Sequence, residues 1–328
     1  MISWWALLLL SLGYVSLLFA IAHWGDKADP ARFSGAARAT IYGLTLAVYC
    51  TSWTFYGAVG TAAQSGWGYL PIYLGPMAVI FFGWGMIHRI ITVSKRQNLT
   101  SIADFIAARY GKARSLAVLV TILATIGSIP YIALQLKAVV AGFDIVSNYA
   151  AAGAAENDTA FVFAAALAVF AILFGTRKID VTEHHDGLML AVAFESVVKL
   201  LAFVAVGMFA WSLLGNQTPA VSPEAAARAS AAFRLDHVPD MFITQLILAS
   251  AAIFCLPRQF HVAVVEAYED ANIRPTRWSF PVYLLIFSAF VIPITLAGLK
   301  MLPPGEFNGD AFVLALPMQG EHTLLTML

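Results

Sequence analysis

The feature that most constrains this chain is the recurrence of apolar runs about as long as a bilayer is thick. They cover residues 2–22, 41–60, 69–91, 115–147, 160–176, 188–214, 241–262 and 280–302. A run of about 20 apolar residues is enough for a helix to cross the hydrocarbon core. We therefore predict an all-α polytopic membrane protein, a single domain over residues 1–328 with eight spans and a ninth beginning after Asp310.

Composition supports a membrane protein and excludes several other classes. The chain is 60% hydrophobic and only 12% charged, whereas soluble domains carry about 25% charged residues. No basic domain is present that would hold nucleic acid. Cys50 and Cys255 lie far apart in apolar stretches, so we expect free, buried thiols and no CxxC metal site. The first run lacks a basic segment before it and a small-residue cleavage site after it, which predicts a retained helix.

The distribution of positive charge predicts the orientation. Lys and Arg residues close to spans stay on the cytoplasmic side. With the N-terminus outside, the predicted cytoplasmic loops hold Lys27, Arg32, Arg38, Arg89, Lys95, Arg96, Arg109, Lys112, Arg114, Arg177, Lys178, Arg258, Arg274 and Arg277. The outer side holds only Arg228, Arg234 and Lys300. This bias predicts a multi-pass protein of the bacterial inner membrane with its N-terminus outside.

Two loops carry signals for surface helices. In NLTSIADFIAARYG, a Ser or Thr ahead of Ile102 can cap a short helix that Gly111 ends. In SPEAAARASAAF, Ser222 can cap a helix with Pro223 at its first position. A hydroxyl at the cap accepts a bond from a free backbone N–H, and proline suits the first helical position because its missing N–H is not needed there.

The second apolar run is unusually polar for a span. After Thr45 it reads LAVYCTSWTFYGAVG, which holds Thr51, Ser52 and Thr54 beside Trp53 and Tyr56 and contains the helix breakers Gly57 and Gly60. Hydroxyls and glycine permit local unwinding, and an unwound segment at membrane depth exposes carbonyls that can hold a cation or a polar solute. The same small residues also let helices pack closely. Both interpretations stay open from the residues alone.

Other polar residues lie in or beside later spans. Gln135 lies near the outer part of its helix, where lining a cavity is the functional interpretation, and Lys137 beside it can extend towards the interface. Glu195 and Lys199 are four residues apart in the order that pairs best along a helix, which predicts a structural pair or, alternatively, a proton relay. Pro257 is expected to interrupt the seventh span.

A cytoplasmic cluster follows the fifth span. Its members are Asp180, Glu183, His184, His185 and Asp186. The HExxH spacing is absent, so we predict no metal site and no catalytic residue. Helix capping and ion pairing is one interpretation, and a gate or proton relay that includes Asp180 and Glu183 is the other.

Several of these segments together resemble the sodium:solute symporter family, in the subgroup whose transporter-like module precedes a sensor histidine kinase. The resemblance covers nearly the whole chain. It rests on CTSWTFYGAVG, NLTSIADFIAARYGKARSLA, IPYIALQLKAVV, FGTRKIDVTEHHDGLMLAVAFESVVKLLA and LPRQFHVAVVEA. The TEHHDGL stretch carries the similarity to the kinase-linked subgroup.

The resemblance implies a LeuT-type inverted-repeat fold with one extra N-terminal helix, truncated at the C-terminus so that the second repeat is incomplete. It places a solute between the second and seventh spans, with Thr51, Ser52, Trp53, Tyr56 and Gln135 as candidate contacts. The backbone carbonyls of Ala47 and Cys50 would hold a coupling ion. No carboxylate lies between Asp29 and Asp104, which leaves three alternatives open: coupling to Na+, coupling to H+, or no coupling.

Three functions follow as hypotheses. The first is a module that binds and transports a small polar metabolite, such as an amino acid or short carboxylate, as the input of a histidine kinase with its response regulator. The second is a stand-alone Na+- or H+-coupled symporter. The third is a multi-pass membrane enzyme, for which only the Asp180–Asp186 cluster offers polar groups on one side.

Overall fold

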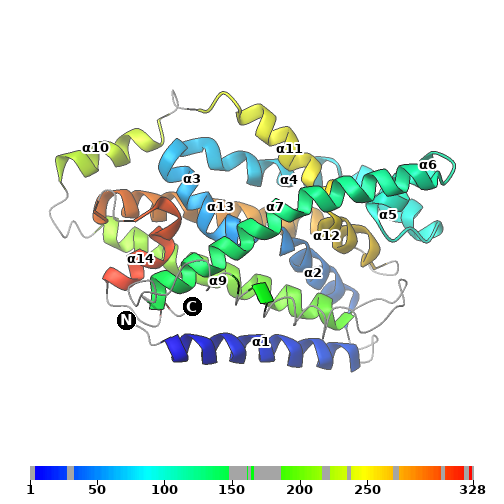
Figure 1. Cartoon of the computed structure of the whole chain (residues 1–328), viewed down its shortest axis with the longest axis horizontal. Helices are drawn as coiled ribbons and strands as arrows, with labels where there is room; N and C mark the ends of the chain where they lie inside the picture. Colours follow the sequence, from blue (N-terminus) through cyan, green and yellow to red (C-terminus); the bar gives the residue numbers. More distant parts are fainter. Residues whose placement is uncertain are drawn as a thin grey trace.

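The fold is known from a computed structural model (Figure 1). It describes residues 4–27, 33–147, 161, 164–165, 186–215, 222–234, 238–268, 273–303, 307–320 and 325–326. Within these residues every regular element is a helix, as the all-α prediction requires.

Four long helices are apolar enough to cross a membrane. They are α1 (Trp4–Lys27), α7 (Arg114–Ser147), α9 (Asp186–Gly215) and α13 (Thr276–Met301). Among the described residues, two bent helix pairs bring the number of candidate spans to at most six. Four to six helices of this kind indicate a multi-pass membrane protein. The predicted span at 160–176 lies almost entirely outside the described residues.

Some predicted spans are bent or broken where the sequence suggested one helix. α4 (Leu70–Phe82) and α5 (Trp84–Arg96) meet at 74°. Gly83 stands at the corner, where a Cβ would lie 2.5 Å from the Val79 carbonyl oxygen. Glycine has no Cβ, and it therefore permits the turn.

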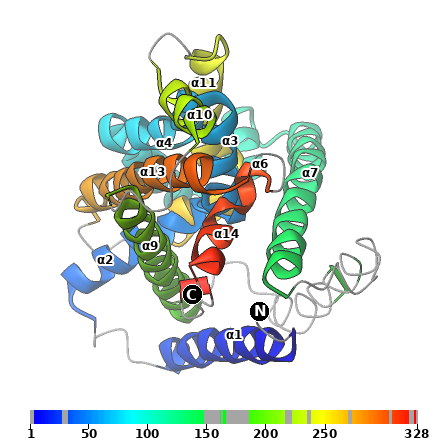
Figure 2. The ribbon, with the colours of Figure 1, turned by 90° about the vertical axis from the view of Figure 1, so that its left-hand side faces the viewer.

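α13 lies at the centre of the bundle, between α9 and α4 (Figure 2). Its inward face is fully buried at Phe280, Leu284, Phe287, Val291 and Ile294. The Phe287 ring stacks on Phe203 of α9 with centroids 4.2 Å apart. Burial of large side chains on this scale is the main favourable term for packing in water, and inside a bilayer the same contacts act through dispersion and close fit.

Buried tyrosines tie neighbouring segments together through their hydroxyl groups. Tyr283 Oη donates to the Ser196 carbonyl at 2.9 Å, and Tyr73 Oη donates to the Thr54 carbonyl at 2.9 Å. Each bond satisfies a hydroxyl that would otherwise be costly to bury.

Two glycines allow α1 to pack closely against α9. α1 crosses α9 where Gly25 meets Gly187, and a Cβ on Gly25 would lie 2.6 Å from Gly187 Cα. The Gly187 backbone N–H donates to Asp26 Oδ1 at 3.0 Å. The two backbones therefore touch directly, as small residues allow between membrane helices.

Both short helices predicted in the loops, with their serine caps, are confirmed. α6 (Ile102–Arg109) begins after Ser101, whose hydroxyl accepts from the Asp104 N–H at 3.0 Å. α10 (Pro223–Ala232) begins after Ser222, whose hydroxyl accepts from the Ala225 N–H at 3.2 Å.

The predicted cytoplasmic and outer elements lie at opposite ends of the bundle. In Figure 1, α5 and α6 lie at one end, and α10, the start of α1 and the last helix, α14 (Phe312–Gln319), lie at the other. Gly309–Ala311, a single 3-10 turn, precedes α14. The expected start of a ninth span is thus an eight-residue helix that ends at Gln319.

Outward faces of the long helices are apolar. On α7 the exposed side chains include Leu119, Ile122, Leu123, Ile126 and Ile129. A face of this composition suits contact with lipid chains.

Candidate functional site

Two helical segments are interrupted near their middles. The first consists of α2 (Gly35–Thr45) and a 3-10 turn (Leu46–Tyr49), then, beyond Cys50, a π-helical turn (Trp53–Gly57) and α3 (Ala58–Ser65). Cys50 is extended, with φ −76° and ψ 108°. The break falls in the polar stretch that the sequence marked for unwinding.

The second interrupted segment is α11 (Phe242–Cys255), followed by α12 (Pro257–Phe260) and a π-helical turn (His261–Val265). The two arms meet at 58°. Leu256 is extended at φ −74° and ψ 120°, because a following proline disfavours the helical conformation. The interruption predicted at Pro257 is confirmed.

The halves of the two segments at the α5–α6 end are joined by hydrogen bonds. Gln259 Nε2 donates to the Leu46 carbonyl at 3.2 Å, and Tyr42 Oη donates to the Ala263 carbonyl at 2.6 Å. All four residues are buried. The breaks therefore lie next to each other, although they are about two hundred residues apart in sequence.

Two predicted solute contacts meet at the first break. The Ser52 backbone N–H donates to Gln135 Oε1 at 3.2 Å, and the Ser52 hydroxyl donates to the same oxygen. Gln135 Nε2 is buried and has no hydrogen-bond partner in the described part of the chain. A buried amide N–H without a partner costs free energy, and it offers a donor to an incoming polar group.

The other predicted contacts have different surroundings. The Thr51 carbonyl accepts from the Thr54 hydroxyl at 2.7 Å, so it stays inside the local turn. The Trp53 indole covers Gly57, where a Cβ would lie 2.8 Å from Trp53 Nε1. The Tyr56 hydroxyl faces Gly142 of α7.

Phe55, which lies between Trp53 and Tyr56 in the sequence, belongs to the core. The Phe55 ring packs against Phe203 at 5.1 Å and against Phe287 at 6.2 Å.

The ion pair predicted within α9 is confirmed. Lys199 Nζ lies 3.1 Å from Glu195 Oε1. Lys199 also donates to the Cys50 carbonyl at 2.9 Å, a contact across 149 residues that the sequence did not indicate. The Ala47 carbonyl accepts from the Cys50 N–H at 2.8 Å. Both carbonyls predicted to hold a coupling ion are thus hydrogen-bonded, while Asp180 and Glu183 lie outside the described residues.

Arg258, next to the second break, was not predicted as a site residue. Its guanidinium donates to the Tyr131 hydroxyl at 2.9 Å and lies 5.5 Å from the centroid of that ring. Tyr131 is one helical turn before Gln135 on α7. The Arg258 guanidinium beside the Tyr131 hydroxyl could bind a carboxylate through charge-assisted hydrogen bonds.

The two cysteines differ in exposure. Cys50 is 1% exposed, whereas Cys255 is exposed on the outside of α11. Neither forms a disulfide. The expectation of two buried thiols is wrong for Cys255, because the apolar face of a membrane helix can point to lipid as well as to protein.

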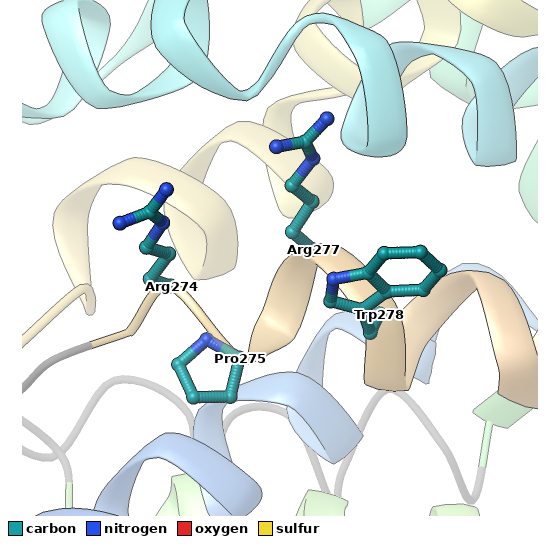
Figure 3. A pocket seen from close by; sticks show the side chains of 4 residues that line it. All are labelled: Arg274, Pro275, Arg277 and Trp278. Atoms are coloured by element: carbon teal, nitrogen blue, oxygen red, sulfur yellow. The ribbon is translucent and has the colours of Figure 1, made fainter.

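A basic hollow of about 290 Å³ lies elsewhere, at the start of α13 (Figure 3). Arg274, Pro275, Arg277 and Trp278 line it. Arg277 Nε donates to the Phe81 carbonyl at 2.6 Å, so this arginine joins α13 to α4. The lining residues do not include any from the two breaks.

Comparison of the chain with protein-family models, with curated proteins and with solved structures found no match in any of the three. The function therefore has to be argued from the site itself.

Proposed function

We propose that the chain is a symporter-like membrane module that binds a small polar solute, an amino acid or short carboxylate, at the paired helix breaks. The observation that carries the proposal is that both interrupted segments contact the same stretch of α7 close to their breaks, Ser52 at Gln135 and Arg258 at Tyr131. Interrupted helices at membrane depth present backbone and side-chain polar groups to a ligand, which intact helices do not.

The direction of the two segments favours alternating access. α2 starts at the end where α5 and α6 lie and runs away from it, whereas α11 runs towards that end (Figure 1). Two antiparallel interrupted helices are the central pair of a LeuT-type inverted repeat, which is the fold we propose. In that fold, the halves rock about a solute held at their breaks.

The polar groups match a small zwitterion or carboxylate. Arg258 supplies a positive charge, Gln135 Nε2 supplies an unpartnered N–H donor, and Trp53 and Tyr56 supply aromatic surface. Small-molecule sites usually contain a few polar groups among apolar and aromatic side chains. The proposal extends to sensory input: bound solute would act on a kinase module and its response regulator.

The test is uptake of radiolabelled amino acids and short carboxylates by bacteria that express the full-length protein. We expect one solute to accumulate, and Ser52→Ala and Gln135→Leu to abolish its uptake. Ser212→Ala is the matched control, because Ser212 is exposed on α9 and, within the part of the chain that the structure describes, its hydroxyl donates to the carbonyl of Phe209 in its own helix.

Two further outcomes are informative. Binding of one solute to the purified protein without uptake would mean that the site acts as a receptor. If no solute in the panel binds or accumulates, or if Ser52→Ala behaves like Ser212→Ala, the proposed site is wrong.

A further inference from the structure

A fixed positive charge lies at the first helix break. Lys199 is near the middle of α9, and its side chain is 23% exposed. Its ammonium group contacts Glu195 Oε1 at 3.1 Å and the Cys50 carbonyl oxygen at 2.9 Å. A lysine in the middle of a span is costly unless it faces partners inside the protein, and here both partners face it.

The Cys50 carbonyl is a strong site for a cation. Residues 35–49 are helical without interruption, first as α2 and then as a 3-10 turn. The C-terminal end of such a segment carries partial negative charge on its unsatisfied carbonyls. Cys50 leaves the helical conformation, and within the described residues the hydrogen bond that its carbonyl accepts comes from Lys199.

We propose that the Lys199 ammonium takes the place of a coupling cation at the Cys50 carbonyl, so that this position does not bind Na+. That the Cys50 carbonyl would otherwise hold a coupling ion rests on the proposed function, whereas its contact with Lys199 does not. The ammonium satisfies the carbonyl as a bound ion would, and it is covalently held by α9.

The surrounding charges agree with this assignment. Glu195 supplies one negative charge from the same helix, and Arg258 of α12 supplies a second positive charge beside the neighbouring second break. A sodium ion on the Cys50 carbonyl would lie within a few ångströms of the ammonium and would be repelled by it. The Ala47 carbonyl, the other predicted ligand, already accepts the Cys50 N–H.

The first test uses Na+ itself as the probe. Thermal unfolding of the purified full-length protein is followed in NaCl, KCl and choline chloride at equal ionic strength, without any solute. We expect the same Tm in all three salts. A saturable rise in Tm that only Na+ produces would overturn the assignment, because a ligand that binds the folded state raises its stability.

The second test removes the charge. In Lys199→Met we expect a lower Tm in KCl and choline chloride, with part of the loss recovered in NaCl because the carbonyl is then free to accept Na+. Lys199→Arg keeps a cation and should show no response to Na+. Lys27→Met is the matched control, since Lys27 is exposed in the last turn of α1.

Either of two results would contradict the inference. Lys199→Met with the wild-type Tm would show that the carbonyl needs no cation, and a loss of Tm that Na+ does not reduce would show that the position is not a cation site. Failure of the solute panel leaves these results unaffected, so the two proposals fail independently.

Discussion

The crossing of α1 and α9 gives the sharpest prediction about stability. An ideal Cβ on Gly187 would lie 1.9 Å from the Ala22 carbonyl oxygen and 2.5 Å from Asp26 Oδ1. Ordinary carbon–oxygen contacts begin at about 3.3 Å, so α1 has to move away from α9 in Gly187→Ala. The retreat strains the hydrogen bond from the Gly187 N–H to Asp26.

The expected cost follows from these contacts. Overpacking costs about 1–3 kcal/mol, and loss of a hydrogen bond to a charged group costs about 1.5–3 kcal/mol. Alanine returns at most about 1 kcal/mol through its higher helix propensity. We expect Gly187→Ala to lower the free energy of unfolding by about 2–4 kcal/mol.

The assay is unfolding of the purified protein by increasing amounts of a denaturing detergent in mild-detergent micelles. Gly13→Ala is the matched control, because a Cβ at Gly13 of α1 meets no atom of the described residues within 4 Å. We expect it to be neutral or to stabilise by up to about 1 kcal/mol. Equal stability of the two variants would refute the direct backbone contact between α1 and α9.

Three further predictions concern other parts of the structure. Gln259→Leu removes the hydrogen bond to the Leu46 carbonyl and should lower the free energy of unfolding by about 1–3 kcal/mol. Gln245→Leu, at an exposed position of α11, should not lower it. Equal effects of the two variants in the same assay would contradict the link between the breaks. Desolvation raises the pKa of Asp310, and Lys137 opposes this shift; the folded state therefore binds a proton more readily than the unfolded state, so stability should increase as the pH falls through the raised pKa. In Asp310→Asn this pH dependence should disappear from the thermal unfolding curves, and its persistence would assign it to another group. A carbene generated by light from a lipid-soluble diazirine should label the Cys255 side chain in the folded protein and the Cys50 side chain only after denaturation, as peptide mass mapping would show; early labelling of Cys50 would contradict its burial.

Local signals in the sequence predicted local structure well. Ser101 and Ser222 were expected to cap helices, and each accepts the backbone N–H three residues later. The pairing of Glu195 with Lys199 was also predictable, because residues four apart share one helix face. In these cases the chemistry lies within one turn of helix.

Prolines show where the sequence was insufficient. Pro257 starts a new helix after an extended residue, whereas Pro130 lies inside α7, which continues on both sides of it. A proline removes one backbone donor in either case. Whether the helix then breaks depends on the segments packed around it, which are remote in sequence.

Contacts across the bundle were the hardest to predict. The sequence marked the polar stretch LAVYCTSWTFYGAVG for unwinding, and the structure has the break within it, at Cys50. Nothing local indicated that Lys199 would reach that break or that Arg258 would meet Tyr131. Both contacts need the relative placement of helices, which only tertiary packing determines.

The segment after the second break is tied to α5 and α6 at its own end of the bundle. Lys95 of α5 donates to the Val265 carbonyl at 2.7 Å, and the Phe105 ring of α6 packs against Phe260 at 6.0 Å. Residues 257–265 therefore cannot shift as a rigid piece without either dragging α5 and α6 along or losing both attachments. A movement that starts at the second break would therefore be passed on to α5 and α6 through these two attachments.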